Sequence, residues 1–219
     1  MALTKFNYNS FDVTPVASTT MAFNSGANGL TTMADGDMVL IKTLTASSSA
    51  TLSFLNGSDD VVFDATYPIY KFVFTNIHPA TDSVEFSFQV DTGTNTSYNQ
   101  QITSTVFRTF HDEADSGTGL AYYDQDQANG TSFQDISDDV GNGNDESVSG
   151  ELWLFNPSSA TFVKHFMATT QDYNANDHSL NWYTAGYVNT ATALTRVQFK
   201  FESGNMDSGT IKLYGIKDS

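Results

Sequence analysis

The stretch SVEFSFQV, residues 83–90, alternates polar and apolar side chains without interruption. Its apolar members are two phenylalanines between two valines, and all four would lie on one face of an extended chain. A period of two with a single apolar face is typical of an antiparallel strand that packs one side against a core. The stretch RVQFKFES, residues 196–203, repeats the pattern. The glutamates of these stretches, Glu85 and Glu202, fall on the polar face, which we expect to be exposed to solvent.

Similar segments recur along the chain, separated by clusters of Gly, Asn, Asp and Ser. Further strands are expected at residues 38–44, 50–55, 70–77, 103–110, 151–156, 161–169, 180–188 and 210–216. About ten strands with little helix between them predict an all-β protein, an antiparallel two-sheet sandwich with the jelly roll as the favoured form. The segments at 38–44, 70–77 and 151–156 are apolar on both faces. We expect them to be central strands, or strands whose outer face meets another subunit.

Two stretches depart from this pattern. Residues 1–35 are rich in Asn, Ser, Thr and Gly with scattered aromatic residues, and they predict an extended N-terminal arm or a weak strand pair. Such an arm would cover the domain or attach it to a neighbour, while residues 36–219 would form the sandwich. Residues 111–147 contain many Asp and no Lys or Arg, so we predict a long acidic loop there, with one short strand near residues 120–123.

The composition narrows the classes of partner. Acidic residues outnumber basic ones by 25 to 9, which gives a net charge of −16. Such a surface repels phosphate groups and anionic lipids, so we expect neither nucleic-acid binding nor membrane insertion. The chain has no cysteine, which excludes a disulfide scaffold, a thiolate metal site and a cysteine nucleophile. The first residues lack the pattern of a signal peptide, and we expect a protein made in a cytoplasm without a secretion signal.

Aromatic side chains beside carboxylates and amides indicate a carbohydrate site, because aromatic faces stack on sugars while polar groups bind hydroxyls. The candidates are Tyr122 and Tyr123 in the acidic loop, and Trp182 and Tyr183 in the strand expected at 180–188. Two alternatives stay open. Tryptophan in a strand is usually a core residue, and tyrosines in a loop often contact another subunit.

Calcium is a second candidate ligand of the acidic loop. Asp124, Asp126 and Asn129 offer clustered oxygen atoms beside a glycine, which suits a hard cation. The spacing differs from an EF-hand loop, because Ala128 and Asn129 stand where that loop needs Asp or Asn and then Gly. The alternative is an acidic loop that simply faces solvent.

The sequence holds no pattern of a nucleophile elbow, a phosphate-binding loop or a zinc site. Glycoside hydrolysis needs two carboxylates close together, and Glu85, Glu151 and Glu202 lie on expected strands, so a pair among them is possible. Acidic β-proteins offer pairs of this kind by chance. We therefore predict a protein that is not an enzyme, with no catalytic residue and no cofactor.

Three segments resemble virion proteins of marine tailed bacteriophages, including cyanophages: VLIKTLTASSSATLSF (39–54), YPIYKFVFTNIHPATDSVEFSFQV (67–90) and SGTIKLYGIK (208–217). In that group a β-rich, jelly-roll-like domain recurs in fibre-type and other accessory structural proteins. The resemblance implies a component of the virion, and it transfers no catalytic residue to this chain.

On this basis we expect a structural protein of a fibre, tail or capsid-surface appendage, assembled in the host cytoplasm and located in the virion. Its expected partners are other virion proteins, sister copies in a homo-oligomer, and a host-surface glycan. A trimer is the first expectation, by analogy with fibre-type jelly rolls. A host-surface glycan-binding module is the alternative, and a glycan depolymerase is the second alternative.

Overall fold

The computed structural model describes residues 20–23, 30–33 and 36–218, and every regular element in these ranges is a β-strand. Two short strands, β1 (Thr20–Phe23) and β2 (Leu30–Met33), pair in antiparallel fashion. They belong to a unit of their own, and residues from Val39 onward form a second unit. The other residues of the arm predicted over 1–35 lie outside the described ranges.

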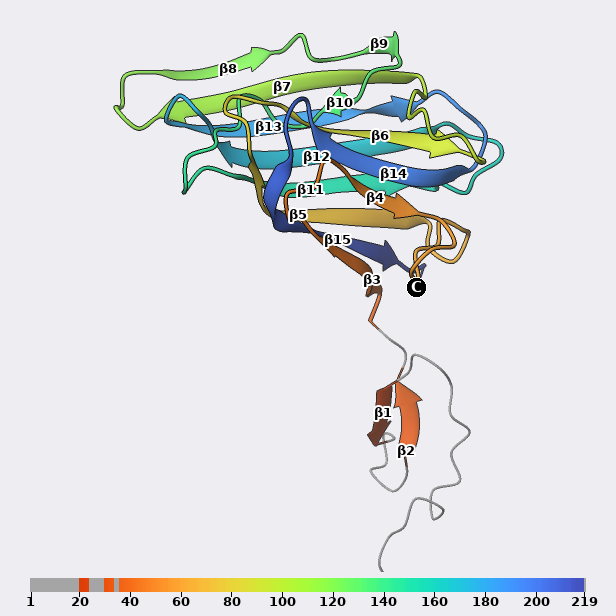
Figure 1. Cartoon of the computed structure of the whole chain (residues 1–219). Helices are drawn as coiled ribbons and strands as arrows, with labels where there is room; N and C mark the ends of the chain where they lie inside the picture. The colour runs from red at the N-terminus through yellow and green to blue at the C-terminus, as the bar shows by residue number, and fades with distance from the viewer. Residues whose placement is uncertain (1–19, 24–29, 34–35, 219) are drawn as a thin grey trace, which may run out of the picture. The chain divides into compact units, whose positions relative to one another are not determined.

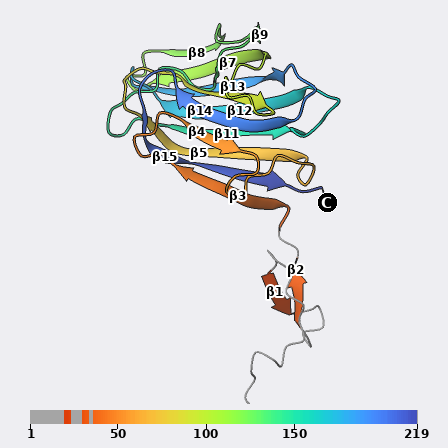
Figure 2. The same ribbon diagram turned by 45° about the vertical axis from the view of Figure 1, so that its right-hand side comes forward.

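The second unit contains two antiparallel sheets, one of nine strands and one of four. Figure 1 and Figure 2 show the smaller sheet lying over the middle strands of the larger one. The order across the larger sheet is β3 (Met38–Thr45), β15 (Met206–Ile216), β5 (Ile69–Pro79), β11 (Val148–Phe155), β12 (Lys164–Tyr173), β13 (His178–Val188), β7 (Ile102–Asp112) and β8 (Thr118–Tyr122), and β9 (Ala128–Gly130) also pairs with β7. The order across the smaller sheet is β10 (Gln134–Asp135), β6 (Phe86–Thr92), β14 (Leu194–Phe201) and β4 (Leu52–Leu55).

The chain crosses between the sheets repeatedly. Each strand of the smaller sheet is preceded and followed in the sequence by a strand of the larger sheet. The predicted antiparallel two-sheet sandwich is thus confirmed, and its connectivity is compatible with a jelly roll.

Phenylalanines fill the space between the sheets. The alternation read in residues 83–90 and 196–203 directs the phenylalanines of β6 and β14 inward, where they meet those of β5. The ring of Phe199 lies at the centre of this group, 5.2 Å from the rings of Phe72 and Phe74 and 6.0 Å from that of Phe86. Burial of each such ring contributes about 1.5–3 kcal/mol, so this cluster is the main source of cohesion between the sheets.

Most of the polar face of residues 83–90 is covered, contrary to the prediction, although Ser83 is exposed. Ser87 and Gln89 are as completely buried as the phenylalanines on the opposite face of β6. Residues from two neighbouring loops cover this side. The Gln89 amide donates to the carbonyl oxygens of Gln100 at 3.1 Å and Ser132 at 2.8 Å. Since backbone carbonyls satisfy the amide, the polar face can be buried at little cost.

Residues 111–147 are not one long loop. The short strand β8 lies where one was expected, but β9 and β10 were not predicted. β8 and β9 pair with β7 in the larger sheet, and β10 pairs with β6 in the smaller one. The segment therefore carries the chain from one sheet to the other and holds its acidic residues in fixed positions.

Candidate functional site

A row of exposed aromatic side chains lies on the outer face of the larger sheet, near the β8 edge. The strand register places Tyr122 of β8 opposite Phe107 of β7, and Phe107 opposite Tyr183 of β13. The rings of Phe107 and Tyr183 stack with their centroids 4.7 Å apart. Tyr122, Phe107 and Tyr183 are 62%, 43% and 37% exposed. We name these three residues the aromatic row, and their exposure makes this face a candidate contact surface.

The same face carries further apolar and charged groups toward the centre of the sheet. Met167 of β12 is 56% exposed and lies opposite Trp153 of β11. The ammonium group of Lys71 stands 4.5 Å above the Trp153 ring and 2.5 Å from Glu151. The Trp153 indole N–H donates to the same carboxylate at 2.7 Å. Aromatic residues and methionine are enriched at protein–protein interfaces, whereas Lys and Glu are depleted there, so Trp153 and Met167 are the members of this group that suit a contact.

A shallow groove of about 490 Å³ opens beside Met167. Its apolar walls come from Phe155, Ala185 and Tyr187, and His165 contributes a polar edge. The outer face therefore offers both exposed rings and a recess next to them.

The structure divides the four residues predicted to bind a glycan. Tyr122 and Tyr183 lie in the aromatic row on the outer face. Trp182 points to the interior and is fully buried, so the structure corrects its assignment as a sugar-stacking residue. Tyr123 lies on the inner side as well, with its ring 5.3 Å from that of Trp182. The residue that sequence reasoning missed in this row is Phe107, whose outward position follows from the alternation along β7.

The predicted calcium ligands do not converge. Asp124 is exposed. Asp126 accepts a hydrogen bond from the Tyr122 hydroxyl at 2.6 Å, and this bond raises the pKa of Tyr122. Asn129 lies on β9, where its side-chain oxygen accepts from Asn189 at 3.0 Å. Each of these last two side chains thus has a partner of its own.

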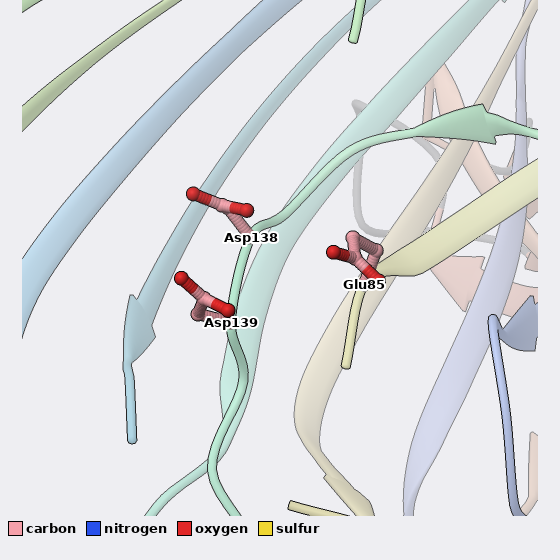
Figure 3. Close-up of side chains that lie close together, drawn as sticks. All are labelled: Glu85, Asp138 and Asp139. Atoms are coloured by element: carbon pink, nitrogen blue, oxygen red, sulfur yellow. The ribbon is translucent and has the colours of Figure 1, made fainter. Parts of the chain in front are cut away.

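The structure brings together a different set of carboxylates, Glu85, Asp138 and Asp139, shown in Figure 3. One oxygen atom from each residue lies within 4.8 Å of the others. Glu85 directly precedes β6, and the two aspartates follow β10. Residues 134–140 run alongside residues 84–88, and this pairing brings the three carboxylates together. The Ser83 hydroxyl donates to Asp139 at 2.7 Å. We name these three residues the acidic cluster.

Asp138 faces a buried cation as well. The Arg108 guanidinium group of β7 pairs with the Asp138 carboxylate and covers the Tyr123 ring at 3.8 Å. Asp138 is 3% exposed. The indole nitrogen of Trp182, under Tyr123, is buried and has no hydrogen-bond partner among the described residues. The interior at this end of the sandwich is therefore polar and incompletely paired.

Burial and mutual repulsion raise the pKa values of three carboxyl groups in this region, those of Glu85, Asp138 and Asp135. Burial first, and then the neighbouring Glu202 carboxyl, raises the pKa of Glu85 to about 7. Burial and then the charge of Asp139 raise the pKa of Asp138 to about 6, although Arg108 opposes the shift. Asp135 rises to a pKa of about 7 through burial and the charge of Glu202. The carboxylates thus outweigh the positive charge available to them.

Sequence reasoning placed Glu85 in the solvent and did not select Asp138 or Asp139. Adjacent aspartates in an acidic stretch look like solvated charge, and nothing in the local pattern shows that β10 carries them onto the start of β6. The comparisons with known proteins give no further guide, since no family model, curated protein or solved structure matches the chain. The described part of the chain contains no helix long and apolar enough to cross a membrane.

Proposed function

We propose that the protein is a non-enzymatic structural component of a bacteriophage virion, in a fibre, tail or capsid-surface appendage. The resemblance of residues 39–54, 67–90 and 208–217 to marine phage virion proteins supports the phage assignment. The observation that carries the structural role is the exposed outer face of the larger sheet, where the aromatic row and Met167 present apolar side chains to solvent.

Assembly would bury this face against sister copies or another virion protein. A stable interface of standard size covers about 800 Å² on each partner, so we expect it to extend beyond the aromatic row onto the neighbouring strands. Exposed rings at the centre of such a patch are the side chains that usually dominate its binding energy. A trimer remains the first expectation for the homo-oligomer.

Light scattering coupled to size exclusion tests the assembly. The wild type is expected to elute as an oligomer at micromolar concentration, and Met167→Lys is expected to shift it to monomer, because the ammonium group would be buried at the interface. Ser53→Lys, at an exposed position on β4 of the smaller sheet, is the matched control and should leave the oligomer intact. A monomeric wild type that is also missing from purified particles by mass spectrometry would overturn the proposal.

Glycan binding is the second candidate function, and the aromatic row is the observation that favours it. Three rings in line on a sheet face, with Asp126 beside Tyr122, provide stacking surfaces and a hydroxyl acceptor. A glycan array read with wild type and with Tyr122→Ala tests it, and Tyr123→Phe, on the inner side, is the control. Equal signals from wild type and Tyr122→Ala would show that the aromatic row does not bind glycan. Release of reducing ends from host polysaccharide, measured in a separate assay, would indicate a depolymerase instead.

A further inference from the structure

We propose that the acidic cluster, Glu85, Asp138 and Asp139, binds one calcium ion, with Asp172 as a buried carboxylate behind it. This inference does not depend on a role in the virion. It replaces the calcium site that the sequence indicated at Asp124 and Asp126.

The oxygen atoms are close enough together to hold one cation. Calcium takes six to eight oxygen ligands at 2.3–2.6 Å in a flexible geometry, whereas magnesium demands a near-ideal octahedron at 2.0–2.1 Å, so an irregular set of carboxylates suits calcium better. In the acidic cluster, one oxygen of each residue lies within 4.8 Å of the others. The three carboxylates can therefore share a calcium ion with little movement, and water would complete its shell.

Asp172 is an independent observation that points to a cation. It shares the inner face of β12 with Thr170, whose hydroxyl donates to the Ile136 carbonyl. Two residues further along the strand, Asp172 is directed in the same way toward the backbone at Asp138. Asp172 is only 1% exposed, and neither of its oxygens accepts a hydrogen bond of normal geometry from a described residue. An unpaired buried carboxylate of this kind is costly, and a nearby cation would offset the cost.

Charge is unbalanced around the site. The carboxylates that surround it belong to Glu85, Asp135, Asp138, Asp139, Asp172 and Glu202, and the cations whose charge acts on them belong to Arg108 and Lys200. One oxygen of Glu85 is also buried without a partner among the described residues. A divalent cation would supply the missing positive charge.

The site has a route to solvent. Glu85 forms part of the wall of a hollow of about 420 Å³ on the outer side of the smaller sheet, together with Asp135 and Glu202. The hollow is lined by three carboxylates and one ammonium group, that of Lys200, so its net charge is negative and favours the approach of a cation.

Isothermal titration with CaCl₂ and thermal unfolding in calcium or chelator, at pH 8 and constant ionic strength, test the proposal. One ion per chain is expected, and a calcium concentration about 100 times the dissociation constant should raise the Tm by about 5–10 °C. Glu85→Gln and Asp139→Asn should each weaken binding at least tenfold. Asp207→Asn, at an exposed position on β15, carries the same change of charge and should bind as wild type.

Several outcomes would overturn the proposal. An unchanged Tm, or an equal rise with magnesium, would show that calcium has no specific site here. Loss of binding in Asp126→Asn but not in Asp139→Asn would place the ion in the stretch that the sequence indicated. Folding of the ligand variants is itself a test, because removing a repelled charge should leave their Tm in chelator equal to or above that of wild type. A fall in that Tm would contradict the claim that these carboxylates lack a counter-charge.

Discussion

Two groups of buried polar side chains in this sandwich differ in how completely they are paired. On the outer side of β6, the fully buried Asp91 carboxylate accepts hydrogen bonds from the backbone N–H groups of Thr92 and Tyr98 and from the side chains of Asn95 and Gln100. Between the sheets, the equally buried Asp172 accepts none of normal geometry from the described residues.

The difference separates a structural group from a candidate ligand. Four donors between 2.8 and 2.9 Å satisfy both oxygen atoms of the Asp91 carboxylate, so its role is to fix the loop of residues 92–100. Both oxygens of Asp172 and one oxygen of Glu85 are buried without a hydrogen-bond partner among the described residues, and negative charge is in excess around them. A folded protein retains such a group at a cost in stability, and binding of a cation is a reason to retain it.

The largest expected effect is that of Asp91→Ala. The substitution leaves two buried backbone N–H groups and two side-chain amides without an acceptor, which should cost about 2–4 kcal/mol and lower the Tm by about 4–16 °C. Differential scanning calorimetry measures the change. Asp207→Ala makes the same substitution at an exposed position and should shift the Tm very little. If the two variants melt alike, the hydrogen bonds around Asp91 do not hold the loop.

Asp172→Asn should have the opposite sign. In chelator at pH 8, replacing the unpaired carboxylate by a neutral side chain of the same shape should raise the Tm by about 2–8 °C. Destabilisation comparable to that of Asp91→Ala would instead show that Asp172 has an effective partner, and the contrast between the two groups would disappear.

The pH dependence of stability is a third way to examine the acidic region. The pKa values of Glu85 and Asp135 rise from 4.5 and 3.8 to about 7, and that of Asp138 rises from 3.8 to about 6. The folded protein therefore binds protons more tightly than the unfolded chain. The resulting stability is fully present below about pH 4 and is lost as the pH rises through 6 to 7.

In chelator, the Tm should therefore fall by a few degrees between pH 5 and pH 8. The charges that act on these carboxyl groups come from Asp124, Asp139 and Glu202, and from the cations Arg108 and Lys200. Calcium should remove much of this fall, because it replaces protons. A fall that persists unchanged in saturating calcium would mean that protons alone keep these acids neutral.

The strands could be predicted from the sequence because each depends on a local alternation. The phenylalanines of residues 83–90 and 196–203 face the core as expected. The environment of the opposite, polar face of these strands could not be predicted from their own sequence. Residues far along the chain cover Gln89, and the strand β10 pairs beside Glu85. Asp172 carried a usable signal. The inward positions of β12 continue through Phe166, Ala168 and Thr170, so extending that strand past residue 169 places an aspartate in the interior.

The aromatic row gives the smallest effect on stability. Phe107→Ala removes a stacked cross-strand pair with Tyr183 on a half-exposed surface, which should cost about 0.5–1 kcal/mol and lower the Tm by about 1–4 °C. Leu55→Ala, at a half-exposed apolar position on β4 of the smaller sheet, is the matched control and should leave association unchanged. Light scattering should show a loss of self-association in Phe107→Ala that is far larger than its loss of stability. Asp91 lies on the outer side of the smaller sheet, and Phe107 lies on the outer side of the larger sheet. Comparing the stability of Asp91→Ala with the self-association of Phe107→Ala therefore distinguishes an outer face that is covered by its own loops from one that is open to a partner. An oligomer of Phe107→Ala as stable as that of wild type would show that the aromatic row is not part of the interface.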